Sequence, residues 1–313
     1  MRAHWIRYGF LVVVVSYALL TWVRVRLSSA YHQAPDQVVT REPGHRLLGS
    51  PQPIANERRK DLEFAWLSEA AYDRAPNSDD AKPGDCSPAD TTLQNMGWKR
   101  WTDFPDSGLL KEISISNLRL EVWSNEAKKA VAVTFGGTIF TSGKDWRSNL
   151  RWFIPFHNDE YTTIVKQFGP AFVQEYSRRQ QLPEWAYLRG ATLFSTGHSL
   201  GGGLAQQFAY ALPTQGGVPL VAKVFAFDPS PVTGFFSVAK ATRDQNSTDL
   251  AIDRIYERGE ILAYLRSFTN FWAPPSAVSP AIRQVRYNLF FTHNAIKGHA
   301  IADLACKLDQ AVR

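Results

Sequence analysis

The sequence predicts an α/β fold in which a largely parallel sheet is covered by helices on both faces. Three observations predict it: short apolar runs alternate with longer helical patterns, the runs are largely continuous in apolar residues, and several of them end at glycine. Strands of a parallel sheet are buried on both faces and are therefore apolar along their whole length. The chain has 313 residues, of which 44% are apolar, so it can bury a core of this size.

The expected elements follow one another from residue 56 onward. A helix is expected over residues 62–72, and residues 73–90 are rich in Pro, Asp, Ser and Gly, which is typical of a loop. The expected strands lie at residues 118–123, 130–135, 191–195, 221–227 and 254–256. The further helices lie at residues 161–178, 200–212 and 300–308. This order favours parallel strands joined by helical crossovers.

Residues 1–30 are predicted to be an apolar anchor or a signal segment. Residues 8–23 carry no charge and are flanked by arginines on both sides. As a helix, this run would span roughly 24 Å, which is short of the hydrocarbon core of about 30 Å. Arg24 and Arg26 follow the run directly, and such a region is usually neutral at a cleavage site. We therefore expect an uncleaved membrane anchor, with an exported protein as the alternative, in preference to a cytoplasmic protein.

The positive charge of the chain is concentrated in this first segment. The formal net charge is +6, and residues 1–30 hold four arginines and no acidic residue. The remainder is nearly neutral, which excludes an extended nucleic-acid-binding surface.

Residues 31–55 are rich in proline and glycine and show no apolar periodicity, so a linker is expected there. Residues 56–313 are expected to form one domain. Cys86 and Cys306 are too few for a disulfide framework and have no metal-ligand spacing. Because nothing in the sequence brings them together, two unpaired thiols are favoured, and a single bridge is the alternative.

The motif Gly-His-Ser-Leu-Gly at residues 197–201 matches G-x-S-x-G. It follows an apolar strand and opens a helix rich in glycine and alanine, which is the strand–elbow–helix arrangement of a serine nucleophile. Ser199 is therefore the predicted nucleophile, and the N–H of Leu200 at the helix start is a predicted oxyanion donor. The alternative is a tight turn whose small residues only allow close packing.

A serine of this type requires an acid and a histidine later in the chain, in that order. Only His293 and His299 follow the nucleophile, and His299 directly precedes the closing helix. His299 is the predicted base. His293 is the alternative base, although a surface or capping role is favoured for it. Two acids that follow expected strands, Asp228 and Glu260, are candidates for orienting the base.

A second oxyanion donor is expected from the loop after the strand at residues 130–135. Two glycines, Gly136 and Gly137, let the backbone approach a substrate there, and Thr138 is the predicted donor. A cluster of large apolar residues follows within the next 20 positions. They form either a wall or lid for an acyl chain or ordinary core packing, and they are Trp146, Trp152, Phe153, Ile154 and Phe156.

These motifs resemble the class 3, or fungal-type, lipase family. The family's oxyanion segment, Phe-Arg-Gly-Thr/Ser, is similar to residues 135–138, with Gly136 in place of the arginine. Its elbow, Gly-His-Ser-Leu-Gly-Gly, is matched at residues 197–202. The family's tryptophan and Asp-Leu pair resemble Trp146 and residues 149–150, in a stretch that forms a lid in relatives.

The same resemblance selects the acid. The family's catalytic Asp lies in a segment like Glu-Arg-Asp-Ile-Val-Pro-His-Leu, which is similar to residues 257–265 here. This similarity implies Glu260 rather than Asp228, with Glu in place of Asp. The family's Pro-Arg-Val-Gly is only partly kept at residues 231–234, and its histidine precedes the last helix, as His299 does.

What the resemblance implies is an α/β-hydrolase fold that cleaves carboxylic esters (EC 3.1.1 class). Lipid esters are the expected substrates, so the activity would be that of a lipase, an esterase or a phospholipase. The implied triad is Ser199, His299 and Glu260, with Thr138 and Leu200 as oxyanion donors. It requires no metal or cofactor, and no obligate protein partner is evident. The alternatives are a non-catalytic binding protein on a hydrolase fold and an acyltransferase.

Overall fold

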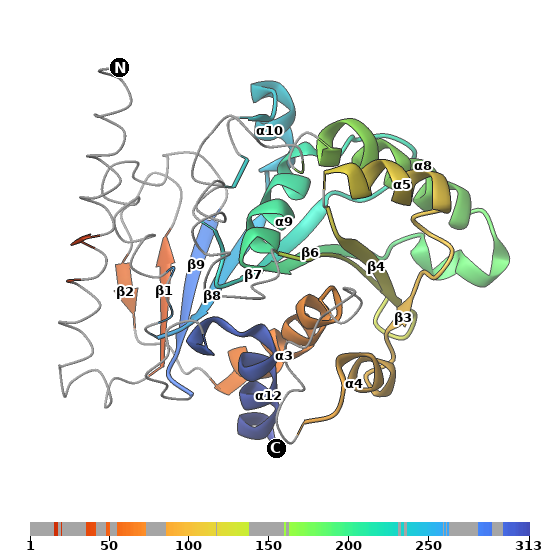
Figure 1. The fold of residues 1–313 in the computed structure, drawn as a ribbon. Coiled ribbons are helices and arrows are strands. Elements are labelled where there is room, and N and C mark those ends of the chain that lie inside the picture. Colours follow the sequence, from red (N-terminus) through yellow and green to blue (C-terminus); the bar gives the residue numbers. More distant parts are fainter. Residues whose placement is uncertain are drawn as a thin grey trace, which may run out of the picture.

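A sheet of nine strands runs through the part of the chain that the computed structural model describes, in the order β2-β1-β9-β8-β7-β6-β5-β4-β3 (Figure 1). The described residues are 16, 17, 20, 36–41, 48–50, 55–72, 86–116, 118–137, 160, 163–230, 233–234, 237–258, 260, 262, 281–289 and 297–313.

The centre of the sheet is parallel and its two margins are antiparallel. The parallel strands are β5 (Ala130–Phe135), β6 (Thr192–His198), β7 (Val221–Phe227), β8 (Ala251–Glu257) and β9 (Ala281–Tyr287). One margin holds β4 (Leu120–Asn125) and β3 (Lys99–Arg100), and the other holds β1 (Gln37–Arg41) and β2 (Leu48–Ser50). The prediction of a largely parallel sheet is therefore confirmed.

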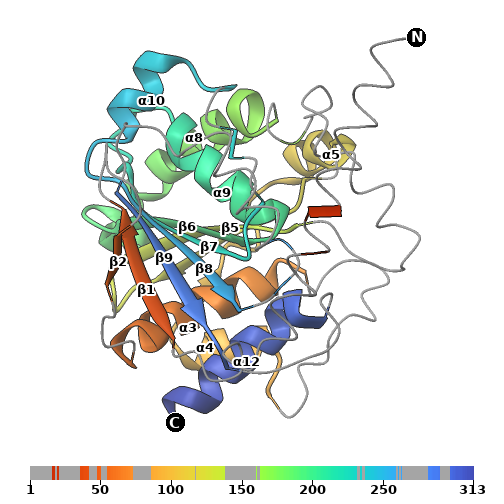
Figure 2. The ribbon, with the colours of Figure 1, turned by 90° about the vertical axis from the view of Figure 1, so that its left-hand side faces the viewer.

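Helices cover both faces of the sheet (Figures 1 and 2). One face carries α5 (Ser107–Ile115), a π-helical turn (Ile164–Phe168), α8 (Gly169–Arg179), α9 (Leu200–Ala211) and α10 (Lys240–Asn246). The other face carries α3 (Ala55–Ala70), α4 (Ala89–Asn95) and α12 (Ile301–Val312). Two short 3₁₀ turns, Pro183–Leu188 and Lys297–His299, complete the described helices. This arrangement is the one that the alternation of apolar runs and helical patterns predicted.

The alternation of side chains along each strand divides the core into two layers. In β5, Val131, Val133 and Phe135 join the apolar cluster beneath α9. Ala130 and Ala132 point the other way, into the cluster beneath α3 and α12. Successive side chains of a strand face opposite sides of a sheet, so one continuous apolar run supplies both layers. This double burial explains why β5 is apolar at every position except Thr134.

The interpretation of residues 31–55 as a linker is wrong for two segments. β1 pairs antiparallel with β9, and β2 pairs with β1, so both segments extend the sheet. Val38 of β1 is buried and belongs to the core on the α3 face. A five-residue strand at the sheet margin, between prolines, has too few residues to show a period. β9 was also not expected from the sequence.

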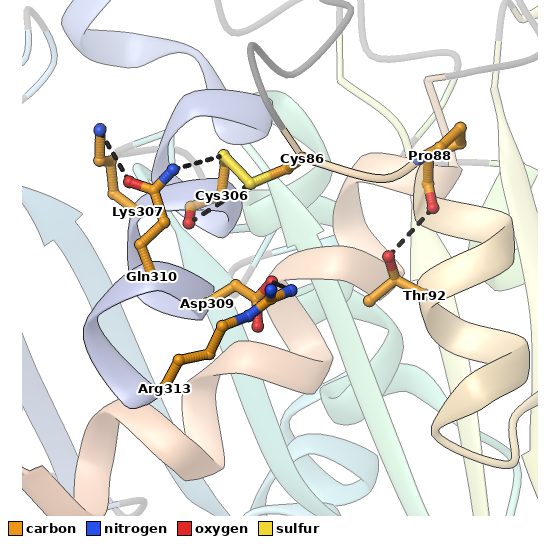
Figure 3. The surroundings of a disulfide bond; sticks show 8 residues. All are labelled: Cys86, Pro88, Thr92, Cys306, Lys307, Asp309, Gln310 and Arg313. Atoms are coloured by element: carbon orange, nitrogen blue, oxygen red, sulfur yellow. Dashed lines mark hydrogen bonds and ion pairs between the residues drawn. A yellow bond between two sulfur atoms is a disulfide. The ribbon is translucent and has the colours of Figure 1, made fainter.

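The expectation of two unpaired thiols is also wrong, because Cys86 and Cys306 form a disulfide (Figure 3). Cys86 lies just before α4 and Cys306 lies within α12, with 5.7 Å between the two Cα atoms. Their separation of 220 residues leaves no local pattern that reveals the pairing. They meet because α4 and α12 both pack beside α3.

No helix among the described residues is both long enough and apolar enough to cross a membrane. The anchor expected at residues 1–30 lies outside the described residues apart from Ser16, Tyr17 and Leu20.

A buried ionic cluster fixes the first half of α3 to the sheet. Asp61 of α3 and Asp253 of β8 are fully buried, and the Tyr287 hydroxyl donates to Asp61 Oδ2 at 2.7 Å. Lys223 Nζ lies 2.5 Å from Asp253 Oδ2, and Arg283 Nε lies 3.1 Å from Asp253 Oδ1. Burial, reinforced by the charge of Asp253, raises the pKa of Asp61 to about 7. The cluster therefore holds a carboxyl group that ionises near neutral pH.

The disulfide is expected to contribute to stability chiefly by restricting the unfolded chain. Replacing both Cys86 and Cys306 with serine should lower the free energy of unfolding by about 2–5 kcal/mol. Urea unfolding with and without reductant measures this loss. Reductant should lower the midpoint of the native chain and leave that of the double variant unchanged, and an equal midpoint for the native chain in both conditions would contradict the bond.

The buried carboxyl group of Asp61 predicts a specific pH dependence of stability. Burial raises the pKa of Asp61 from an ordinary value of 3.8 to about 7 in the folded chain, so the folded state binds an extra proton between these pH values. The contribution of this group to the free energy of unfolding is therefore largest below about pH 4. It falls as the pH rises to 7 and stays low above it. The full difference corresponds to at most about 4 kcal/mol.

Asp61→Asn should flatten this fall, because the amide cannot ionise and can still accept the Tyr287 hydroxyl. Urea unfolding at a series of pH values from 4.5 to 8 compares it with Asp244→Asn, which removes an exposed carboxylate. Parallel pH profiles for Asp61→Asn and the native chain would rule out the buried titration.

Candidate active site

Ser199 lies in a strained turn between β6 and α9. Its backbone angles are φ 57° and ψ −122°, which non-glycine residues adopt only when the surrounding structure enforces them. The residue directly follows β6 and precedes α9, so the strand–elbow–helix arrangement expected from G-x-S-x-G is present. The serine is 3% exposed. A hydroxyl held in this way has a fixed position at the end of the parallel sheet.

The glycines around the serine are required by close backbone contacts. A Cβ atom on Gly201 would lie 2.0 Å from the Phe135 carbonyl oxygen, and one on Gly197 would lie 2.4 Å from the Gly201 carbonyl oxygen. Neither backbone can move without separating α9 from β5 or β6. The small residues thus permit the elbow itself, as expected from the sequence.

The elbow is also bonded to the neighbouring strand. Ser199 N–H donates to the Phe227 carbonyl at 2.9 Å, and Ser230 N–H donates to the Ser199 carbonyl at 2.9 Å. Leu200, the predicted oxyanion donor, is the first residue of α9. The first N–H groups of a helix lack partners within it, and the helix dipole places partial positive charge there. This end of α9 can therefore stabilise a negative oxygen beside Ser199.

His299 and Glu260 form a buried hydrogen-bonded pair. The distance between His299 Nδ1 and Glu260 Oε2 is 3.0 Å, and both residues are almost fully buried. Glu260 Oε2 also accepts the Leu262 N–H at 2.7 Å, which orients the carboxylate. Glu260 follows β8, and His299 ends the 3₁₀ turn before α12. With Nδ1 directed at the carboxylate, Nε2 is the nitrogen that remains for proton transfer.

Asp228, the other acid considered from the sequence, lies in the same site. It follows β7 with φ 39° and is fully buried. His198, Asp228 and His299 each have one nitrogen or oxygen atom that could bind a metal, and these three atoms lie within 4.8 Å of one another. The centroids of the two imidazole rings are 4.5 Å apart. The structure therefore brings both candidate acids to the base, and Glu260 has the hydrogen bond to His299 Nδ1.

Two side-chain groups in the described chain have the composition of cation sites. One is the set of His198, Asp228 and His299, which are also the residues surrounding the base. The other consists of the carboxylates of Glu57, Asp61 and Asp253, where Lys223 and Arg283 already supply positive charge.

The oxyanion loop begins at Gly136 and Gly137, directly after β5. The Gly137 N–H donates to the Tyr72 hydroxyl at 2.9 Å, and the Arg119 guanidinium donates to the Gly137 carbonyl. From the sequence, Tyr72 was expected only at the end of a helix packed on the core, and no role was predicted for Arg119. Neither residue has a fixed spacing to the loop, so no local pattern in the sequence indicated these contacts.

Several sequence-based expectations lie outside the described residues. They are Thr138 as an oxyanion donor, His293 as the alternative base, and the apolar wall formed by Trp146, Trp152, Phe153, Ile154 and Phe156. These remain predictions.

Neither a protein-family model nor a curated protein matches the chain. Among solved structures, a lipase from Rhizopus microsporus var. chinensis is similar, with 18% identity, 85% of this chain and 88% of that chain covered, and a TM-score of 0.45. Lip2 lipase from Yarrowia lipolytica is 18% identical over 79% of this chain and 93% of its own, with a TM-score of 0.45. Rhizomucor miehei triacylglyceride lipase is 17% identical over 75% and 80%, with a TM-score of 0.43.

The α/β-hydrolase fold expected from the sequence is confirmed by this chain's own parallel strands, elbow and covering helices. The similar solved structures are fungal lipases, the kind of protein that the sequence motifs resemble.

Proposed function

We propose that this protein is a serine hydrolase that cleaves carboxylic esters through Ser199, His299 and Glu260. The observation that carries the proposal is a serine in a strained elbow at the same sheet edge as a buried His–Glu pair. Ser199 and Glu260 follow the carboxyl ends of β6 and β8, and the His299 ring lies 4.5 Å from that of His198, the last residue of β6. Open α/β sheets place their ligands at this edge. A tight turn that only packs small residues would not require the buried His–Glu pair.

The reaction is acyl transfer in two steps. Ser199 Oγ attacks the ester carbonyl carbon while its proton passes to His299 Nε2, and the Glu260 carboxylate stabilises the resulting imidazolium. His299 then returns the proton to the departing alkoxide oxygen, which leaves as the alcohol. Water attacks the acyl-enzyme with His299 again as base, and the acid is released. The N–H groups of Leu200 and Thr138 are the proposed donors to the oxyanion.

Lipid esters are the proposed substrates, on the basis of the sequence resemblance and the apolar residues that follow the oxyanion loop in the sequence. An exported or membrane-anchored location is proposed for the same chain. The disulfide between Cys86 and Cys306 supports it, because such bonds persist mainly in oxidising compartments.

The nucleophile is tested by labelling with a fluorophosphonate probe. The native chain should label and hydrolyse p-nitrophenyl esters, and Ser199→Ala should do neither. Comparing butyrate with palmitate esters then separates an esterase from a lipase. Equal labelling of Ser199→Ala, or no labelling of the native chain, would overturn the proposed activity.

The two buried acids are separated by amide substitutions that keep their size. Glu260→Gln should lower kcat by roughly 10³- to 10⁴-fold, because the amide can no longer balance the imidazolium. Asp228→Asn is the matched control and should lose much less. A reversed ranking would assign the orienting role to Asp228, and thermal unfolding of both variants checks that each is folded.

A further inference from the structure

Gly137 in the oxyanion loop is held from two sides by side chains of two different elements. Its N–H donates to the hydroxyl of Tyr72, which follows α3, and its carbonyl accepts from Arg119, which precedes β4. The backbone of Arg119 takes part as well, because its carbonyl accepts the Gly136 N–H at 3.0 Å. Both polar groups of one loop residue are thus fixed by groups from outside the loop.

The Tyr72 hydroxyl also reaches the residue before the nucleophile. It lies 2.9 Å from His198 Nδ1 and 3.1 Å from the His198 carbonyl oxygen. A phenol has one proton to donate and accepts through its oxygen, so it accepts from Gly137 while it donates to His198. Burial raises the pKa of Tyr72 well above its usual range, so the hydroxyl keeps that proton. One side chain therefore joins the oxyanion loop to the elbow.

Two glycines make room for this arrangement. A Cβ atom on Gly137 would lie 2.3 Å from the Tyr72 hydroxyl oxygen and 3.2 Å from Ser199 Cβ. A Cβ atom on Gly136 would lie 3.2 Å from Arg119 Cβ. The loop backbone therefore lies directly against both holding side chains and against the nucleophile. The guanidinium carbon of Arg119 is 5.4 Å from the Tyr72 ring centroid, so the two side chains also contact each other.

We propose that Arg119 and Tyr72 are positioning residues that set the oxyanion loop at its working distance from Ser199. The inference rests on the proposed hydrolase activity and assigns neither residue a contact with substrate. Because the Gly137 N–H already donates to Tyr72, the proposed donor to substrate is the next residue, Thr138, which is covalently joined to Gly137. Stabilisation of an oxyanion depends on donors within a few tenths of an ångström of their best position. The hydrogen bonds of Tyr72 and Arg119 to Gly137 fix the backbone that precedes the donor.

The test compares Tyr72→Phe and Arg119→Met with the native chain on a soluble ester. Each variant keeps most of the side-chain volume and loses the hydrogen bond. Each should lower kcat by roughly 10- to 100-fold, the effect of a small displacement at a reacting centre, and leave KM within about twofold. The inhibition constant of an alkyl boronic acid, which forms a tetrahedral adduct with the serine, should rise in parallel with the loss of kcat.

The controls separate positioning from folding. Arg100→Met removes an arginine whose Nη1 lies 3.2 Å from Glu121 Oε1, away from the loop, and should leave kcat unchanged. Arg119→Lys, which retains a cationic donor, should recover part of the loss. Thermal unfolding shows which variants are folded, and kcat and KM are compared for those variants.

The outcomes distinguish this inference from the proposed activity. Failure of the native chain to label at Ser199 overturns both. If the native chain labels, and the folded variants keep kcat within twofold or raise KM instead, Arg119 and Tyr72 do not position the loop and the hydrolase assignment stands.

Discussion

The site depends on one steric constraint, the contact of three backbones at the elbow. The end of β5, the end of β6 and the start of α9 approach so closely that no Cβ atom fits at Gly197 or Gly201. This contact forces Ser199 into its positive φ and fixes the first turn of α9 against the sheet. The proposed nucleophile, the N-terminus of α9 and the loop after β5 are therefore all positioned by this one contact. A change in any of the three backbones would displace the other two.

α3 connects this site to the buried ionic cluster around Asp61. Its first half is fixed by the ionic cluster around Asp61, and Phe64 in its centre stacks on Phe225 of β7 with ring centroids 3.8 Å apart. Further along, Ser68 Oγ lies 2.8 Å from Thr196 Oγ1 in β6. The helix is followed by Tyr72, which contacts the oxyanion loop. The position of the proposed oxyanion loop is thus set by packing along the whole length of a helix.

The sequence predicted best where the signal was local. The strands at residues 130–135 and 221–227 were expected with their observed bounds, because a continuous apolar run ends abruptly at glycine or aspartate. The elbow was expected from five residues and their context. Glu260 was distinguished from Asp228 only through a family resemblance, since both acids follow strands and the structure places both near His299.

The features that the sequence did not predict all depend on contacts between residues far apart in the chain. The pairing of β1 with β9 joins segments about 240 residues apart, and the marginal strands are too short to show a period. Tyr72 and Arg119 act on Gly137 from positions that have no fixed spacing to it. A pattern along the chain cannot reveal contacts of this kind, because they depend on how the sheet is assembled.

The disulfide has a topological consequence for the chain. The bond between Cys86 and Cys306 closes a covalent ring that contains Gly137, Ser199 and both members of the His–Glu pair. α3 and Tyr72 lie in the tail before this ring. A protease that cuts once inside the ring leaves a single covalent molecule, whereas a cut between Tyr72 and Cys86 releases the tail. The part of the chain that holds the proposed triad is thus protected against loss of a fragment. α3 and Tyr72, which is one of the two side chains proposed to position the oxyanion loop, are not.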